Sequence, residues 1–155
     1  MLESMRPARP ADAEELYRLR EEAAAWQVDR GEWWVCPSDR GGISAAVRVV
    51  DADPAIWGDT ADSGFIHGLV VARDAIGGQL GSRVRTWAEE LIGDAGHHWA
   101  RLDCVATNER LRSYYRAQGY VECGVDFGPA ARWHPVIRFE KRLRLTDDDP
   151  DRPNS

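Results

Sequence analysis

Two adjacent glycines, Gly77 and Gly78, stand directly before a segment with helical periodicity in the stretch "VARDAIGGQLGSRVRTWAEEL", residues 71–91. The first turn of a helix offers backbone amides without intrahelical acceptors and the positive end of the helix dipole. Glycines let a ligand approach the backbone closely. This combination is suited to binding a phosphate group. The plainest alternative is that the two glycines form only a tight turn.

The phosphate-binding P-loop does not fit this stretch. Its last glycine is followed by a Lys-Ser or Lys-Thr pair, which binds the phosphates and the magnesium ion. Here Gly81 is followed by Ser82 and Arg83. The sequence therefore excludes a P-loop.

The dinucleotide-binding fingerprint G-x-G-x-x-G fits in part. Gly78 and Gly81 match it and Asp103 lies about 20 residues further on, but Ile76 takes the place of the first glycine. The residues "ARDAI" also separate the glycines from the preceding strand, whereas the fingerprint turns directly out of its strand. A dinucleotide site stays an alternative.

The elements around the glycines predict a strand followed by a helix. The run "FIHGLVV" at 65–71 is apolar on both faces, which is typical of a central strand. After the glycines, apolar residues recur at helical spacing from Leu80 to Leu91, and the segment 93–96 ends the helix. We therefore expect the glycine turn to join a buried strand to the N-terminus of an amphipathic helix.

The rest of the chain alternates between further strand and helix patterns. We predict a strand at 1–9, a helix at 11–26, a hairpin of strands 32–35 and 43–50, and a polar loop over 51–64. Beyond the central helix we predict a strand at 99–106, a helix at 107–118 capped by Thr107 or Asn108, and strands at 120–127 and 136–145. The order β-α-β-β-β-α-β-α-β-β indicates a single α/β domain over 1–145, in which helices cover a mixed sheet. The acidic segment 146–155 is expected to be a solvated tail.

Composition excludes several classes of function. The chain has 155 residues and a net charge of −6, which gives no electrostatic reason to expect nucleic acid or an anionic membrane as a partner. Three cysteines without a C-x-x-C spacing predict neither a disulfide framework nor a thiolate zinc site, and we expect no metal. The sequence has no signal-peptide pattern and no apolar stretch of about 20 residues. We therefore expect a cytoplasmic protein.

Residues 69–81 resemble motif A of the GNAT superfamily of N-acetyltransferases, written L-x-V-x-x-x-x-[QR]-G-x-G-x-[GA]. The match runs from Leu69 through Val71 and four further residues to "IGGQLG", which ends at Gly81. Two positions depart from the motif: Ile76 replaces Gln or Arg, and Gln79 replaces a glycine. The first departure removes a side chain that often assists pyrophosphate binding. The second requires Gln79 to adopt the loop conformation without the conformational freedom of glycine.

A second segment, "NERLRSYYRAQGY" at 108–120, resembles motif B of the same superfamily. That motif reads N-x-x-[AL]-x-x-x-Y-x-x-x-G-[FY] and is matched at Asn108, Leu111, Tyr115, Gly119 and Tyr120. Together the two motifs cover residues 69–120. The resemblance is weakest over residues 26–62, where the superfamily commonly forms its acceptor lid.

The resemblance implies a mostly antiparallel mixed sheet that is splayed between its fourth and fifth strands, with helices on both faces. Acetyl-CoA or another acyl-CoA would be the co-substrate and would lie in the gap. The residues implied to bind it are Leu69, Val70, Val71, Ile76, Gly77, Gly78, Gln79, Leu80, Gly81, Ser82, Asn108 and Tyr115.

The resemblance also implies catalytic roles for two residues. Tyr115 would return a proton to the departing CoA thiolate, whereas its neighbour Tyr114 points elsewhere around the helix and is expected to pack. His67 is the candidate base that deprotonates the acceptor, although a lone strand histidine is more often structural. Glu32, Asp126 or a water molecule are the alternative bases.

The implied function is an N-acyltransferase, most simply one that moves acetyl from acetyl-CoA to a primary amine of a small molecule or peptide. The alternative is a GNAT-like domain that binds CoA without turnover, as a sensor or interaction module. An edge strand at the C-terminus could also pair with a second copy of the chain and form a homodimer.

Overall fold

The computed structural model describes residues 21, 24–58, 61–126 and 134–144. The chain divides into two units, Met1–Trp33 and Trp34–Ser155. In the first unit residues 24–29 are helical, in agreement with the end of the predicted helix. The predicted strand at 1–9, most of the predicted helix at 11–26 and the acidic tail at 146–155 lie outside the described residues.

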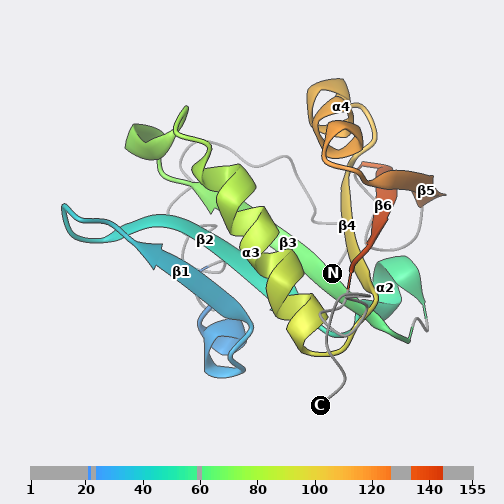
Figure 1. Ribbon diagram of the computed structural model, residues 1–155, viewed down its shortest axis with the longest axis horizontal. Helices are drawn as coiled ribbons and strands as arrows, with labels where there is room; N and C mark the ends of the chain where they lie inside the picture. The colour runs from blue at the N-terminus through green and yellow to red at the C-terminus, as the bar shows by residue number, and fades with distance from the viewer. Residues whose placement is uncertain (1–20, 22–23, 59–60, 127–133, 145–155) are drawn as a thin grey trace, which may run out of the picture. The chain divides into compact units, whose positions relative to one another are not determined.

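The second unit is built on a six-stranded sheet of order β1-β2-β3-β4-β6-β5 (Figure 1). β3 and β4 are parallel, whereas the pairs β2–β3, β4–β6 and β5–β6 are antiparallel. The predicted mixed, mostly antiparallel sheet is therefore confirmed, as is the central position of the apolar strand before the glycines. The strands are β1 (Trp33–Pro37), β2 (Ile43–Val50), β3 (Ser63–Val71), β4 (Trp99–Val105), β5 (Val121–Asp126) and β6 (Val136–Arg142).

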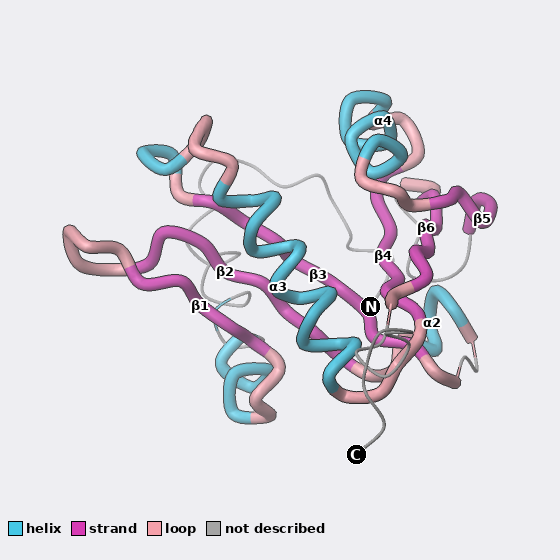
Figure 2. The backbone as a smooth tube through the Cα atoms, in the orientation of Figure 1, coloured by secondary structure: helices cyan, strands magenta, loops and turns pink. Residues whose placement is uncertain are grey.

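The two central strands pair only at one end. Ser63, Gly64 and Phe65 of β3 are in register with residues 99–101 of β4. Beyond this point the two strands diverge (Figure 2), while β4 stays paired with β6 along its other edge as far as Val105. This confirms the splay predicted between the strands at 65–71 and 99–106, which are β3 and β4 in the structure. It also leaves the backbone of β3 from residue 66 onward without a ladder partner on the β4 side, within the described residues.

Helix α3 (Leu80–Asp94) lies across one face of this sheet, as Figure 1 shows. Its residues Ala88 and Ile92 are buried in one cluster with Leu102 of β4. The helix approaches β3 so closely that a Cβ atom at Gly64 would overlap the side chain of Ile92. Glycine at position 64 is therefore a packing requirement, because no side chain fits between the strand and the helix.

Helix α4 (Glu109–Ala117) contacts β5 and packs onto the same apolar cluster through Leu111 and Tyr115. A short helix, α2 (Pro54–Trp57), lies on the opposite face, where the ring of Trp57 packs against Phe65. Helices therefore cover both faces, as predicted. However, α2 falls within the segment predicted to be loop, because four residues carry no readable periodicity.

A buried charge network joins α3 to the sheet. The carboxylate of Glu89 accepts hydrogen bonds from Arg85, from Tyr120 Oη (2.8 Å) and from Lys141 Nζ (2.8 Å). The side chains of Arg85 and Glu89 are only 5% and 8% exposed. Because buried charges are costly unless paired, loss of one partner from this network would destabilise the packing of α3 on the sheet.

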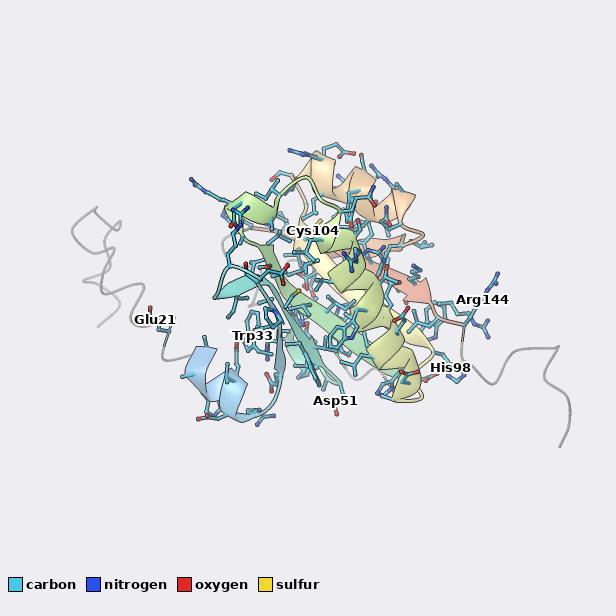
Figure 3. The ribbon with its side chains drawn as sticks, turned by 60° about the vertical axis from the view of Figure 1, so that its left-hand side comes forward. Glu21, Trp33, Asp51, His98, Cys104 and Arg144 are labelled. Atoms are coloured by element: carbon cyan, nitrogen blue, oxygen red, sulfur yellow. The ribbon has the colours of Figure 1, made fainter. Side chains whose placement is uncertain are left out.

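Two further predictions concern buried residues. Cys104 is 6% exposed and lies within the apolar cluster, which confirms that it is a small core residue (Figure 3). The prediction that Trp87 belongs to the core is wrong, since its side chain is 39% exposed. Helical spacing identified the apolar stripe of α3 but not its edge, where Trp87 contacts Trp34 of β1 instead of the core.

Candidate functional site

The glycine turn leads into α3 through two residues with a positive φ angle, Gly77 (φ 95°) and Gln79 (φ 59°, ψ 13°). Gln79 is the N-cap residue, and its side chain makes no capping hydrogen bond. The amide of Arg83 donates to Gln79 O at 3.1 Å, which is the first hydrogen bond of the helix. The amides of residues 80–82 therefore have no intrahelical acceptor, and they form the kind of site that binds an anion.

Gln79 occupies the left-handed region at the position where motif A has a glycine. This conformation costs a residue with a side chain about 1–2 kcal/mol. The expectation that Gln79 must take the loop conformation without the freedom of glycine is therefore confirmed. Ile76, the other departure from the motif, is extended (φ −68°, ψ 139°) and 69% exposed.

Tyr114 connects α4 to this turn. Its hydroxyl lies 2.9 Å from Ser82 Oγ, in the first turn of α3. The prediction assigned Tyr114 only to packing, and the hydrogen bond shows a more specific role. The sequence gives no sign of it, because the two residues are 32 positions apart and meet only through tertiary folding.

Tyr115 lies among aromatic rings at the inner side of α4. Its ring centroid is 5.5 Å from those of Tyr114 and Phe139 and 5.8 Å from that of Tyr120. Burial raises the pKa of Tyr115 to about 12, and the nearby thiol of Cys104 adds to this effect. The phenol is therefore protonated at neutral pH and has a proton to donate.

Asn108 caps α4, because its Oδ1 accepts a hydrogen bond from Leu111 N at 3.1 Å. The prediction of a cap at Thr107 or Asn108 is confirmed for Asn108. Capping alone accounts for an asparagine at this position. Its expected contact with a cofactor stays a prediction.

A bulge in β3 separates the directions in which His67 and Leu69 point. The β2–β3 register shifts between Ala46 and Arg48, and Gly68, which follows His67, has a φ of 57°. Because of this extra residue His67 and Leu69 point to opposite faces of the sheet. Leu69 packs against the core under α3. His67 projects to the face that carries α2.

Two carboxylates flank His67 on that face. His67 Nε2 is 3.3 Å from Asp53 Oδ2, and His67 Nδ1 is 4.0 Å from Asp103 Oδ2. Burial raises the pKa of the Asp103 carboxyl, with further increases from the charges of Asp53 and Asp126 and a decrease from His67. By residue type the cluster could also hold a metal ion, since one ligand atom from each of Asp53, His67 and Asp103 lies within 4.8 Å of the others.

The alternative bases, Asp126 and Glu32, belong to different units of the chain. Asp126 is close enough to Asp103 to influence its pKa. Glu32 belongs to the first unit, where Arg30 Nε donates to it at 2.7 Å. The sequence analysis missed Asp53 altogether. An Asp-Pro pair in a polar loop indicates a turn, and this pattern does not predict that Asp53 lies beside His67.

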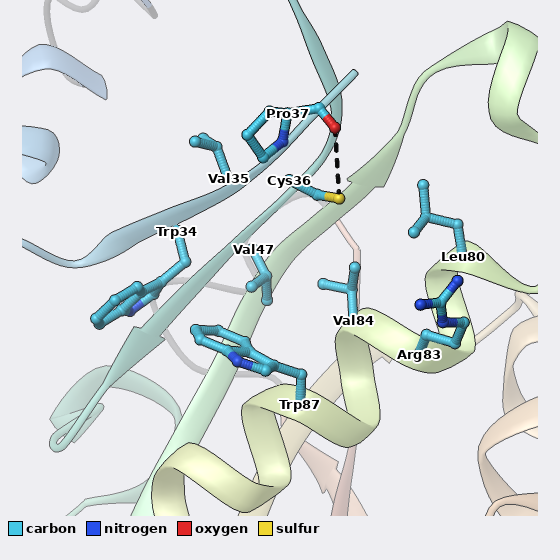
Figure 4. A pocket seen from close by; sticks show the side chains of 9 residues that line it. All are labelled: Trp34, Val35, Cys36, Pro37, Val47, Leu80, Arg83, Val84 and Trp87. Carbon is cyan, nitrogen blue, oxygen red and sulfur yellow. Dashed lines mark hydrogen bonds between the residues drawn. The ribbon is translucent and has the colours of Figure 1, made fainter. Parts of the chain in front are cut away.

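An apolar pocket of about 390 Å³ opens on the α3 face, away from His67 (Figure 4). It lies between β1, β2 and the first turns of α3, and the rings of Trp34 and Trp87 meet in it edge to face at 5.2 Å. Leu80 is the one predicted cofactor-binding residue that lines it. The predicted site residues gather instead at the glycine turn and along the gap between β3 and β4.

The model of the acetyltransferase (GNAT) family matches residues 1–120. The chain belongs to the GNAT acetyltransferase family. This confirms the resemblance drawn from motifs A and B, and it places the glycine turn, the splayed strands and α4 in the part of the chain that carries the family pattern.

A relative of known sequence is also named as an N-acetyltransferase. The protein named as the uncharacterized N-acetyltransferase YesJ of Bacillus subtilis (strain 168) is 35% identical over 122 residues, which are 75% of this chain and 64% of that protein. This chain therefore spans less than two thirds of the length of that relative.

Solved structures share the fold. An acetyltransferase of the GNAT family from Listeria monocytogenes 4b F2365 has a TM-score of 0.62 at 22% identity, over 89% of this chain and 93% of that one. An acetyltransferase from Bacillus anthracis str. Ames, solved in complex with acetyl coenzyme A, has a TM-score of 0.58 at 14% identity, over 72% and 62% of the two chains.

Among the described residues of this GNAT protein, no helix is both long and apolar enough to cross a membrane.

Proposed function

We propose that this GNAT protein transfers an acetyl group from acetyl-CoA to a primary amine of a small molecule or peptide. The observation that carries the proposal is the combination of an uncapped helix N-terminus at Gln79 with a gap between β3 and β4. The first suits a pyrophosphate and the second suits an extended amide-bearing chain, and coenzyme A contains both groups.

The cofactor's phosphates would lie on the amides of residues 77–82. Its pantetheine amides would pair with the backbone of β3 near residues 69–71, as an added strand would. A family member of the same fold is known in complex with acetyl coenzyme A, which supports this choice of co-substrate. The turn lies near the strand, because a Cβ added at Gly81 would be in ordinary van der Waals contact with Val71 Cγ2, at 3.5 Å.

His67 and Tyr115 would carry out the two proton transfers of the reaction. An amine near neutral pH is mostly ammonium and cannot attack a thioester until a base removes a proton. His67 would take that proton on the α2 face. An amide of β3 at the bulge would stabilise the oxyanion, and Tyr115, which is protonated at this pH, would donate a proton to the leaving thiolate.

A thermal-shift titration tests the co-substrate first. At 100 times its dissociation constant acetyl-CoA should stabilise the protein by about 2.7 kcal/mol. For a chain of this size that corresponds to a rise in Tm of roughly 5 to 10 °C. NAD serves as the control for the dinucleotide alternative. A shift with NAD alone would contradict the proposal.

Tyr115→Phe tests catalysis separately from binding. We expect a fall in kcat of about 100-fold, because general acid catalysis contributes about 10²–10⁴-fold. The Tm shift with acetyl-CoA should be unchanged, because the ring is kept. Tyr114→Phe, on the same helix, removes a hydroxyl that contacts Ser82 of the phosphate-binding turn and not the thioester, so it should retain kcat and change only the KM for acetyl-CoA. If the wild-type protein binds acetyl-CoA but releases no CoA with any amine of a broad panel, the non-catalytic binding module is the correct alternative.

A further inference from the structure

The two ring nitrogens of His67 face different carboxylates. Nε2 faces Asp53 at 3.3 Å and Nδ1 faces Asp103 at 4.0 Å. A neutral imidazole has one N–H group and one lone pair, so it can donate to only one of the two. The carboxylate on the other side must then find its donor elsewhere. The two carboxylates therefore have different roles, and the structure indicates which of them accepts from the N–H group.

Asp53 is the carboxylate that needs the N–H of His67. It occupies the N-cap position of α2, where an aspartate usually accepts from the first amides of the helix, yet its side chain makes no capping hydrogen bond. Its Oδ2 atom is buried and has no hydrogen-bond partner among the described residues. At 3.3 Å the Nε2–H group is the donor within reach, and such contacts often tighten only when substrate is bound.

Asp103 is the carboxylate on the Nδ1 side of the ring. Its distance of 4.0 Å from Nδ1 is too long for a hydrogen bond. Its side chain is only 20% exposed, and the negative charges of Asp53 and Asp126 act on it. An ammonium ion between Asp103 and Nδ1 would neutralise this carboxylate and lie against the lone pair of the imidazole.

We propose that Asp53 is a positioning residue that holds Nε2–H of His67, and that Asp103 binds the ammonium group of the acceptor beside Nδ1. This inference rests on the proposed function. The ammonium gives one proton to Nδ1, which leaves a neutral amine and an imidazolium stabilised by Asp53. The amine nitrogen then carries the lone pair that forms the bond to the thioester carbon. As the C–S bond breaks, the thiolate takes the proton of Tyr115, and the second proton of the attacking nitrogen goes to solvent, from which the phenol is reprotonated. The acceptor class is thus a cationic amine, recognised by its charge at the reacting nitrogen.

A metal ion fits the same atoms less well. If Asp53 holds Nε2–H, an ion on the other side of the ring would have only Nδ1 and Asp103 as ligands. Zinc sites in enzymes use three protein ligands. The three residues lie close enough to share an ion, and it is the assignment of Nε2–H to Asp53 that leaves too few ligands for zinc.

Other charged groups lie near the two carboxylates. Arg48 of β2 is in register opposite His67, Arg138 of β6 is in register opposite Asp103, and the charge of Asp126 acts on Asp103. All three stay unchanged in the variants used here. Differences between those variants therefore report on Asp53 and Asp103 alone.

Nitrogen-15 NMR of the histidine rings tests the tautomer without any need for activity, with His67→Gln used to assign the signal. In the wild-type protein the neutral ring should carry its proton on Nε2. Asp53→Asn should abolish that preference, because the Asn amide can turn its NH₂ group toward Nε2. Asp103→Asn should leave the preference in place. A wild-type ring protonated on Nδ1 would overturn the inference.

Steady-state kinetics test the division of roles, with the best acceptor among cadaverine, tyramine and glycinamide as the probe amine. Asp53→Asn should lower kcat by about 10- to 100-fold with the amine KM within threefold, and it should change the pH profile of kcat/KM. Asp103→Asn should raise the amine KM by about 10- to 100-fold with kcat within threefold. Asp51→Asn, an exposed aspartate two residues before Asp53, is the matched control and should change neither constant.

Two outcomes separate this inference from the proposed function. If acetyl-CoA gives no thermal shift in the wild-type protein, the proposed function fails, while the NMR experiment still decides the role of Asp53. If both variants lose the acetyl-CoA shift, or if the two kinetic effects are exchanged, the assignment of the carboxylates is wrong even though the transferase activity stands.

Discussion

At the scale of single residues, Gln79 is where this chain departs most informatively from its family. Motif A has a glycine at this position, and the structure retains the glycine-like conformation, with φ at 59°. The conformation is therefore required by the turn into α3 and not by the residue type. The chain accepts a local conformational cost at the site where we propose that the phosphates bind.

Gln79→Gly should relieve this cost. The gain from removing a left-handed glutamine is about 1–2 kcal/mol, and the greater freedom of glycine in the unfolded chain offsets about 0.5–1 kcal/mol of it. We expect a net stabilisation of about 0.5–1 kcal/mol, measured by urea unfolding, with acetyl-CoA affinity equal or higher. Glu90→Gly, at an exposed position within α3, is the control and should cost about 1 kcal/mol. Equal destabilisation by both substitutions would contradict the argument.

At the scale of elements, α3 begins at the glycine turn and packs on the sheet, and so fixes the position of the turn. Its buried face carries apolar residues together with an ion network centred on Glu89, which binds Arg85 and Lys141 and accepts from Tyr120. Helical periodicity predicted the apolar stripe. It did not predict the charged residues inside it, because their partners come from α3 itself and from segments 31 and 52 residues further along.

Glu89→Ala should destabilise the protein strongly. Removing one partner leaves the buried guanidinium of Arg85 uncompensated, which typically costs about 3–5 kcal/mol. Urea unfolding of the variant measures the loss. The matched control is Glu90→Ala, the next residue on the exposed side of the same helix, which should change stability by less than about 0.5 kcal/mol. A loss below about 1 kcal/mol for Glu89→Ala would show that the network contributes little.

At the scale of the whole molecule, buried phenols link stability to alkaline pH. Burial raises the pKa of Tyr115 to about 12 and raises the pKa of Tyr120 further, and the carboxylate of Glu89 adds to the second shift. Above pH 10 the phenols of the unfolded chain ionise while those of the folded chain stay protonated. The folded state then binds more protons than the unfolded state, so stability falls as pH rises.

Urea unfolding between pH 8 and pH 11.5 measures this dependence. The free energy of unfolding should be nearly constant with respect to these phenols below pH 9 and fall above pH 10, by about 1.4 kcal/mol per pH unit for each shifted phenol. In Tyr115→Phe the slope between pH 10 and pH 11.5 should be smaller by the contribution of one group. Identical slopes in the two proteins would contradict the assigned burial.

The sequence by itself determined the local features of this protein. The apolar strand at 65–71, the glycine turn, the cap at Asn108 and the periodicity of α3 and α4 depend on residues close together in the chain, and the two motifs identified the family. The tertiary structure alone decided which distant side chains meet. Regular alternation from Phe65 places His67 on the α2 face, and the bulge at Gly68 sends Leu69 to the other face. The register of β3 and β4 brings His67 to Asp103, while a four-residue helix presents Asp53. Register, bulges and short helices depend on packing between segments, so no spacing along the chain encodes them.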